Sequence, residues 1–419
     1  MGPVVRSLIL KRFRSIRAGQ IIFDNPTFLV GRNGSGKSNI ADAFAFLAEA
    51  MDLPLHEVLD RRGGIANLLH KASDQKFSSL GIAIELDNRE ILKTTWENFE
   101  SLAPELVARN IVTARYALEI KALPDYRFEI DREQCVLTRA DGSRAWFDRR
   151  QQSMKTNVGP VAGAPIKVMV AESLALPRIG FTDDFFLVLQ ILRRMRVYSI
   201  EPPRLREMQD PDSGASLRRD GSNAASVLEE IKRRMPRDIP RIEQFLSTIV
   251  PGIGSVSTTR HGQKLTLDFT QKWDETKHLN FEAFNMSDGT LRALGLLLAI
   301  FQREKPSLIV VEEPESSIHP AAAGAVLDLL RHATKEMQVV VSTHSPEILD
   351  AKWIEDRHLR VVSWQKGVTS VSRISDMSRK ALQDHLMQAG ELMRSEALET
   401  DPLFEDAPER QANLFEEVV

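Results

Sequence analysis

The apolar positions of the chain repeat with two different periods, and the N-terminal segment shows both. Apolar and polar residues alternate in the first runs, whereas apolar residues recur every three or four positions after the glycine-rich turn that follows Val30. Alternation is typical of a half-buried strand, and the longer spacing is typical of an amphipathic helix. The pattern therefore predicts three strands and then a helix, at residues 6–13, 20–23, 27–30 and 39–50.

The middle of the chain changes from a strand period to a helix period. Residues 61–175 contain alternating runs bounded by turn residues, and residues 182–250 contain apolar residues at helical spacing. We therefore predict strands at 80–86, 114–120 and 126–130, helices at 185–196, 224–234 and 242–249, and a further strand at 264–269.

Helices and strands then alternate from residue 284 to about residue 365. The predicted order is a helix at 291–301, a strand at 307–311, a helix at 321–332 and a strand at 338–342. Such alternation indicates a parallel sheet with right-handed crossovers. One helix is predicted at 378–398, and a disordered acidic tail should follow it.

Composition restricts the class of protein and its compartment. Hydrophobic residues make up 42% and charged residues 27% of the 419 positions, as in an ordinary globular protein. The single cysteine, Cys135, excludes an internal disulfide and suits a reducing compartment. The sequence shows neither an apolar run of membrane-span length nor a secretory signal. We therefore expect a cytoplasmic protein without membrane contact.

The net charge of −3 is unevenly distributed. From Ser395 onward the tail carries eight acids and one base, so the rest of the chain is mildly basic. Bases cluster at 193–196, 218–219 and 232–234. Such clusters fit either a surface that faces DNA or ordinary solvated helix faces.

A phosphate-binding motif lies between the predicted strand at 27–30 and the helix that follows. Residues 31–38 match G-x-x-x-x-G-K-[ST], and the strand before and helix after are the context that the motif requires. Backbone N–H groups of such a loop surround phosphates, the lysine bridges the β- and γ-phosphates, and the serine binds Mg²⁺. The predicted nucleotide-binding residues here are Gly31, Asn33, Gly34, Ser35, Gly36, Lys37, Ser38 and Asn39, with Ser38 also a metal ligand.

Two adjacent acids end the predicted strand at 307–311. A carboxylate is needed to hold Mg²⁺, and a second one to orient or deprotonate the attacking water. We assign Glu312 to the metal and Glu313 to the water. The alternative is a strand whose acids simply reach solvent.

Three further motifs resemble those of ABC-type ATPases. Residues 284–290, Phe-Asn-Met-Ser-Asp-Gly-Thr, resemble the signature in its SMC and RecF-like form. Residues 313–320 resemble the D-loop, and 338–346 resemble the strand that carries the switch histidine, here His344. Taken alone, the signature could be a turn with a helix N-cap, and His344 could be a core histidine.

The whole pattern is similar to a prokaryotic group of predicted AAA-family ATPases related to SMC, RecF and OLD proteins, often linked to anti-phage defence. Its marks here are Asn39, Asp42, residues 61–64 (Arg-Arg-Gly-Gly), residues 219–223 (Arg-Asp-Gly-Ser-Asn), the signature and the His-Pro motif. The resemblance implies an α/β fold, namely a two-lobed ABC ATPase head on a P-loop NTPase sheet, with an antiparallel β-rich insertion and a helical subdomain. The expected segments are an N-terminal ATPase lobe (1–60), the insertion (61–175), the helical subdomain with strands (176–280), a C-terminal ATPase lobe (281–375), and a helix with an acidic tail (376–419).

The resemblance also implies ATP and Mg²⁺ as ligands and a homodimer that encloses ATP. Ser287 and Gly289 would face the γ-phosphate held by the opposing subunit, and His344 would sense it. Glu312 replaces the aspartate of many relatives, and Asp288 and Thr290 replace a glycine and a glutamine, so we expect slow hydrolysis. Phe13 or Arg14 either contacts adenine or packs on the sheet.

The resemblance favours an ATPase coupled to DNA transactions or to a separate effector, such as a TOPRIM-like nuclease subunit, in anti-phage defence or DNA repair. The alternative is a regulatory switch for a protein effector without direct contact with duplex DNA. A transporter subunit fits the β-rich insertion less well. Finally, residues Gln411 to Phe415 resemble the short peptide that docks bacterial proteins on the sliding clamp, although a solvated tail or one docked on a neighbouring subunit explains them as well.

Overall fold

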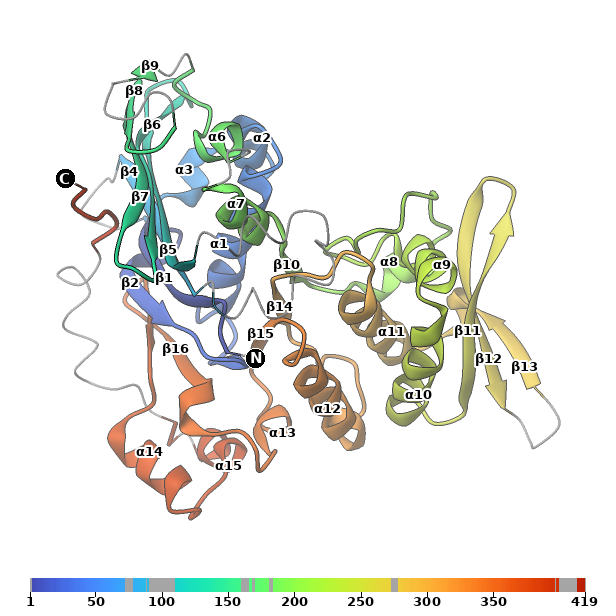
Figure 1. Ribbon diagram of the computed structural model, residues 1–419. Helices are drawn as coiled ribbons and strands as arrows, with labels where there is room; N and C mark the ends of the chain where they lie inside the picture. The colour runs from blue at the N-terminus through green and yellow to red at the C-terminus, as the bar shows by residue number, and fades with distance from the viewer. Residues whose placement is uncertain are drawn as a thin grey trace. The chain divides into compact units, whose positions relative to one another are not determined.

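The structure is a computed structural model that describes residues 2–71, 78–87, 89, 110–159, 166–167, 170–180, 184–272, 278–395, 397–398 and 413–418. The chain forms two compact units. Unit 1 comprises residues 1–195, 356–381 and 398–419, and unit 2 comprises residues 196–355 and 382–397. Each unit is described separately below, with the labels of Figure 1.

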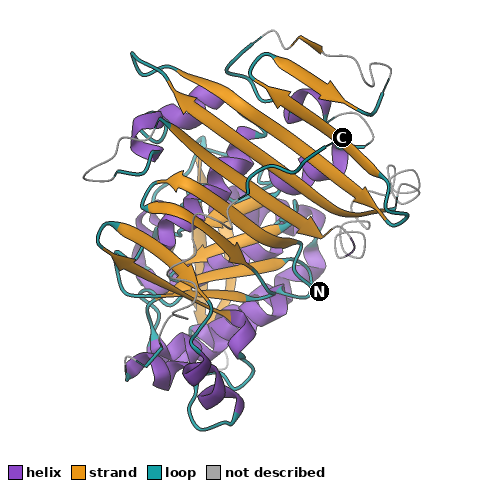
Figure 2. Cartoon of the chain, turned by 90° about the vertical axis from the view of Figure 1, so that its left-hand side faces the viewer, coloured by secondary structure: helices purple, strands orange, loops and turns teal. Residues whose placement is uncertain are grey.

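Unit 1 is built on an eight-stranded sheet in the order β2-β1-β4-β5-β6-β7-β8-β9 (Figure 2). Every neighbouring pair in it is antiparallel. The strands are β1 (Val5–Phe13), β2 (Ile16–Ile22), β4 (Ser79–Asp87), β5 (Ile111–Ala122), β6 (Phe128–Arg139), β7 (Arg144–Arg150), β8 (Ser153–Thr156) and β9 (Ile166–Lys167). The antiparallel strands expected within residues 61–175 therefore lie in the same sheet as β1 and β2.

A second set of strands in unit 1 carries the phosphate loop. The strand β3 (Thr27–Val30) is parallel to β16 (Leu359–Gln365), which is antiparallel to β17 (Val368–Ser372). The buried helix α1 (Lys37–Ala50) follows β3. The shorter helices of the unit are α2 (Leu55–Asp60), α3 (Ile65–Leu68), α6 (Leu176–Ile179), α7 (Phe186–Arg193) and most of α14 (Asp376–Gln383).

The helix α11 (Asp288–Phe301) is the central helix of unit 2. Its apolar side chains are almost all buried, and it packs against α8 (Pro202–Arg206), α9 (Ala224–Arg234), α10 (Ile239–Ile249) and α12 (Ala323–Ala333). Beside these helices lies an antiparallel sheet of β11 (Ile253–His261), β12 (Lys264–Lys272) and β13 (His278–Glu282). The strand β14 (Leu308–Glu312) is parallel to β15 (Gln338–Thr343). The remaining elements include β10 (Met195–Tyr198), α13 (Pro346–Leu349) and α15 (Ala389–Arg394).

Three predictions differ from the structure in the kind of structure formed, beyond shifts in the ends of an element. The helix expected at 185–196 ends at Arg193, and the strand β10 begins at Met195, where Val197 and Tyr198 are buried. The helix expected at 378–398 is two helices, α14 and α15, separated by a turn in which His385 has a φ of 55°. The tail was expected to be disordered, but residues 413–418 lie on the sheet of unit 1 and Leu414 is buried. Most of the acidic segment, residues 399–412, lies outside the described residues.

No helix among the described residues has both the length and the low charge that crossing a bilayer would require.

Candidate functional site

The phosphate loop of unit 1 has the backbone shape that anion binding needs. It runs from the end of β3 to the first residue of α1, and Gly34 and Gly36 have φ values of 77° and 104°. Such positive values are readily adopted by glycine alone. Asn33, Gly34 and Ser38 are exposed, so the N-terminus of a fourteen-residue helix faces solvent here. The partial positive charge of that N-terminus favours an anion.

Lys37 lies in the middle of this loop. Its ammonium group donates to the carbonyl oxygens of Gly31 at 2.7 Å and Arg32 at 3.1 Å, and the residue is buried. The lysine is therefore curled against the loop carbonyls. A bound phosphate would offer it a stronger, charge-assisted partner.

A threonine on β17, which no sequence motif marks, supports the loop. The hydroxyl of Thr369 donates to the carbonyl of Ser35 at 2.9 Å and lies 2.7 Å from the hydroxyl of Ser15. The side-chain amide of Asn39 donates to the Ser15 hydroxyl. Asn39, a predicted nucleotide ligand, is therefore hydrogen-bonded to a residue that helps to hold the loop. A methyl group on Gly36 would lie 2.2 Å from the Thr369 hydroxyl, which leaves room only for glycine.

Gly31 also has a close neighbour, and Ser35 is buried. A methyl group on Gly31 would lie 2.2 Å from the carbonyl oxygen of Val362 on β16. The Ser35 hydroxyl is buried and has no hydrogen-bond partner among the described protein atoms. It is thus a polar group that lacks a protein partner within the predicted phosphate site.

An acid on α1 pairs with two arginines, one that precedes the phosphate loop in the sequence and one that follows it. Asp42 accepts from Arg14 at 2.8 Å and from Arg62 at 3.0 Å, and Arg62 also pairs with Glu49 at 2.8 Å. The Arg-Arg-Gly-Gly segment is thus linked to α1 through Arg62 and Asp42. Arg14 is engaged with Asp42, whereas Phe13 is fully buried against Phe46, so Phe13 packs on the sheet.

The two predicted acids end β14 in unit 2, and each has its own partner. The side chain of Glu312 is only 11% exposed and pairs with Arg219 at 2.8 Å. Arg219 belongs to the Arg-Asp-Gly-Ser-Asn segment, whose backbone is fixed by hydrogen bonds from Ser199 to Arg219 and from Glu201 to Asp220. Sequence reasoning noted this segment without assigning it a role. The structure makes Arg219 the counter-ion of the predicted metal ligand.

Glu313 and His344 lie together, as the predicted base and sensor should. One carboxylate oxygen of Glu313 is 3.1 Å from Nδ1 of His344, and both side chains are about two-fifths exposed. Glu313 has a φ of 46°, a left-handed value that is rare for a residue with a side chain. Its N–H donates to Ser342 on β15, which fixes this backbone. Unusual backbone values of this kind cluster at functional sites.

A third acid, Glu315, lies close to this pair and is partly buried. Burial raises the pKa of Glu315, which accepts a 2.6 Å hydrogen bond from Thr343 through one oxygen and, within the described part of the chain, has no hydrogen-bond partner at the other. Burial also lowers the pKa of Arg292 on α11, whose side chain donates to the Glu313 carbonyl at 3.5 Å. The turn after β14 therefore lies beside two partly buried ionisable side chains, Glu315 and Arg292.

The signature residues form the N-terminus of α11. Ser287 caps the helix, accepting from the N–H of Thr290 at 3.2 Å, with the two hydroxyls 2.8 Å apart. Asp288 pairs with Arg206. A methyl group on Gly289 would lie 2.5 Å from the Ser317 carbonyl, so the signature turn touches the turn that resembles a D-loop. Ser287 is exposed while it caps the helix, so both interpretations of it remain open.

The basic clusters of the sequence are largely paired with nearby acids. Arg193 pairs with Asp52 in unit 1, and Arg218 with Asp212 in unit 2. Arg233 and Arg234 both pair with Glu230. These pairs reduce the positive potential that a DNA-binding surface would need.

The comparisons with known proteins agree with this geometry. A family described as "AAA domain, putative AbiEii toxin, Type IV TA system" matches residues 27–97 and 196–350, which is more than half of the chain. The Old nuclease of Escherichia phage P2 is 23% identical over 375 residues, covering 83% of this chain and 57% of that protein. The phosphate import ATP-binding protein PstB of Mycoplasmoides gallisepticum is 30% identical over 83 residues, covering 20% of this chain and 25% of PstB. The chain therefore spans less than two thirds of either relative.

Solved structures of SMC heads share the fold. A SmcHead bound to the C-winged helix domain of ScpA has a TM-score of 0.52 at 15% identity, covering 90% of this chain and 99% of that one. The Smc head of Pyrococcus furiosus, with an extended coiled coil and bound to the C-terminal domain of ScpA, has a TM-score of 0.52 at 14% identity, covering 92% and 100%.

The phosphate loop, the acid strand and the SMC-head fold define a P-loop ATPase domain of the ABC type, in its SMC and OLD branch. The family match narrows the assignment within that class. The chain belongs to the AAA-domain family whose description names the AbiEii toxin and the type IV toxin–antitoxin system.

Proposed function

We propose that this chain binds and hydrolyses MgATP, dimerises around it, and uses the cycle to gate a separate effector subunit. The observation that carries the proposal is the pair formed by Glu313 and His344, at 3.1 Å and on a strained backbone. A carboxylate beside an imidazole can orient a water and accept its proton. Both groups are accessible, as a water-activating pair must be.

The residues of the phosphate loop fit the nucleotide part of the proposal. The exposed N-terminus of α1 and Lys37 supply the positive charge that a triphosphate needs. Ser38 and Glu312 offer the oxygen ligands that Mg²⁺ prefers. When bound, Mg²⁺ would neutralise charge on the β- and γ-phosphates. Arg219 would then have to share Glu312 with the metal.

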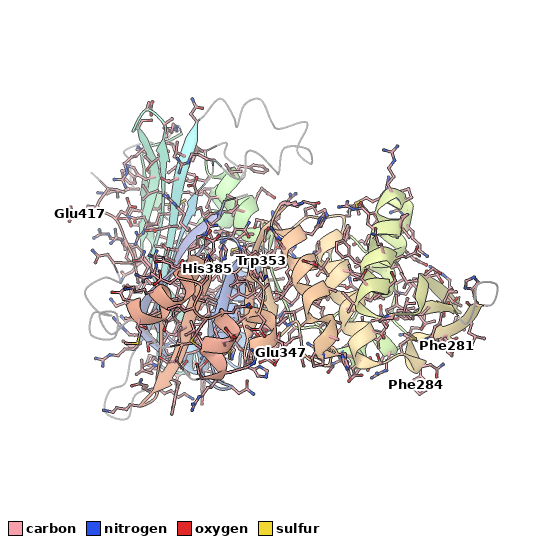
Figure 3. The ribbon with its side chains drawn as sticks, turned by 90° about the horizontal axis from the view of Figure 1, so that it is seen from below. Phe281, Phe284, Glu347, Trp353, His385 and Glu417 are labelled. Carbon is pink, nitrogen blue, oxygen red and sulfur yellow. The ribbon has the colours of Figure 1, made fainter. Side chains whose placement is uncertain are left out.

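The surface around the signature supports dimerisation. Phe284, just before the signature, is 75% exposed, and Leu279 on the neighbouring β13 is 44% exposed (Figure 3 labels Phe284). Ser287 and Asp288 are exposed beside them at the N-terminus of α11. Large apolar side chains next to a helix N-terminus suit a partner that brings both an apolar surface and a phosphate.

The proposal of an effector rests on a similar protein and not on the geometry of the site. The relative of phage P2 is called a nuclease, and this chain spans 57% of it. We propose that a TOPRIM-like nuclease subunit receives the signal, in anti-phage defence or DNA repair. Direct binding of duplex DNA by the basic clusters is the less favoured route, because the pairs with Asp52, Asp212 and Glu230 offset part of their charge.

The test is steady-state ATP hydrolysis by the wild type and by Glu313→Gln, with and without linear duplex DNA. We expect Glu313→Gln to lower kcat by about 100-fold or more, the typical contribution of a general base. The variant should still bind ATP and, when ATP is present, elute at the mass of a dimer. Glu57→Gln, an exposed acid on α2, is the matched control and should behave like the wild type.

Each outcome separates one part of the proposal. Hydrolysis that survives in Glu313→Gln would exclude Glu313 as the base. A monomer in ATP would exclude the dimer while leaving the ATPase intact. Stimulation by DNA would favour a direct role for DNA, and indifference to DNA would favour a switch that acts on a protein effector.

A further inference from the structure

The outer face of the eight-stranded sheet carries a strip of small apolar residues. Across three strands, Ile9 on β1 pairs with Ala83 on β4, and Ala83 pairs with Ala117 on β5. Gln134 on β6 continues the row. The helices α1, α6 and α7 lie against the opposite face, whereas the C-terminal segment crosses this one (Figures 1 and 2).

Leu414 fills a notch in this strip. It is 4% exposed and packs against Ile9, Ala83 and Ala117. A methyl group on Gly81 of β4 would lie 2.1 Å from a Leu414 methyl, and its three nearest atoms all belong to that leucine. The missing side chain of Gly81 therefore shapes a seat for one leucine.

The sheet also binds the backbone of the segment. Arg115 donates to the carbonyl oxygens of Asn413 and Leu414, the latter at 3.2 Å. The Gln134 side chain donates to the Glu416 carbonyl at 2.9 Å and accepts from the Glu416 N–H at 2.8 Å. The Gln134 amide thus supplies both a donor and an acceptor to one residue of the peptide, as the backbone of a neighbouring strand would.

Side-chain contacts complete the match. The Arg132 guanidinium lies 4.3 Å from the centre of the Phe415 ring, within the range of a cation–π contact. Arg144 pairs with Glu416 and donates to the Glu417 carbonyl. Figure 3 labels Glu417 at the end of this segment. The strip thus offers a leucine seat, an aromatic contact and a basic border to an acidic peptide.

We propose that the outer face of this sheet is a binding site for a short acidic peptide with the sequence Leu-Phe-Glu, and that residues 413–418 of the same chain are its resident ligand. Tethering makes the tail bind independently of protein concentration. Leu414 and Phe415 are also the pair that the sequence offers to a sliding clamp. Any partner that binds Leu414 and Phe415 has to compete with the sheet for these side chains.

The first experiment is hydrogen exchange on the full-length chain. The Glu416 N–H should exchange at least tenfold more slowly in the wild type than in Gly81→Val, because valine suits a strand but fills the leucine seat. Gly19→Val on β2 of the same sheet is the matched control, since a Cβ there meets no atom within 4 Å. Equal exchange in wild type and Gly81→Val would overturn the site. Protection that disappears on dilution would show that a second copy supplies the tail, and would overturn the tethered ligand.

The second experiment supplies the peptide in trans. A fluorescein-labelled peptide of residues 409–419 is titrated into full-length Leu414→Ala/Phe415→Ala protein, whose seat is vacated but whose fold is complete. We expect saturable binding at least tenfold tighter than to the wild type, and its loss when Gly81→Val is added. A peptide with the same two alanines should not bind. Failure of the native peptide to bind the double variant would refute the proposal.

Discussion

At the scale of single residues, three glutamates within four positions have three different environments. Glu312 faces Arg219, Glu313 faces His344, and Glu315 is partly buried and accepts a hydrogen bond from Thr343. The same side-chain chemistry can therefore serve as metal ligand, base and structural acid, because the partner and the burial differ. Only the first two roles could be proposed from the sequence, since burial of Glu315 depends on β15 and α11.

Replacement of Arg219 tests whether Glu312 is the metal ligand. In Arg219→Ala the carboxylate loses its cation, so we expect the Mg²⁺ concentration for half-maximal hydrolysis to fall by about two- to fivefold, as a partly exposed ion pair allows. Arg218→Ala is the matched control, because it removes the adjacent pair with Asp212 from the same segment. A Mg²⁺ dependence unchanged in Arg219→Ala would argue against Glu312 as a ligand.

At the scale of elements, prediction succeeded where one period dominated. The strand β3 and the helix α9 have the predicted ends, because the glycine-rich motif directly follows β3 and an amphipathic helical period covers α9. The helix predicted at 185–196 was wrong at its end, because an apolar run fits both α7 and β10. The split between α14 and α15 was missed because no glycine or proline marks it. The strand β17 and its support of the phosphate loop could not be predicted, since Thr369 is 334 residues from Ser35.

The support of the loop by β17 leads to a prediction about affinity. Thr369→Val keeps the shape of the side chain but removes its contacts with Ser35 and Ser15. At about 1 kcal/mol for each hydrogen bond, ATP should bind roughly five- to thirtyfold more weakly. The measurement is calorimetric titration with ATP. Ser370→Ala, which removes a hydroxyl contact with Ser363 from the next position of β17, should leave affinity unchanged.

At the scale of the whole molecule, the chemistry is divided between the two units. Unit 1 holds the phosphate loop, and unit 2 holds the signature, both acids and His344. The chain leaves unit 1 after residue 195 and returns at residue 356, and the matched family also covers two separate stretches. Neither unit is thus a contiguous piece of sequence.

If each ATP site is formed by both subunits of the proposed dimer, two inactive variants should complement each other when mixed. Lys37→Ala should lose the phosphate loop, and Ser287→Arg should lose the signature, so each protein alone should be inactive. A mixture should recover up to about one quarter of wild-type hydrolysis, because half of the random dimers carry one intact composite site. A mixture as inactive as its components would contradict sites shared between subunits.

The contact between Gly289 and Ser317 has a mechanical consequence. Backbone meets backbone there, with no room for even a methyl group and no flexible side chain to absorb a displacement. A displacement of the start of α11 is therefore transmitted directly to the turn after β14, because the two backbones are in close contact. Glycine at 289 is then required for this direct contact, independently of any ligand at the turn.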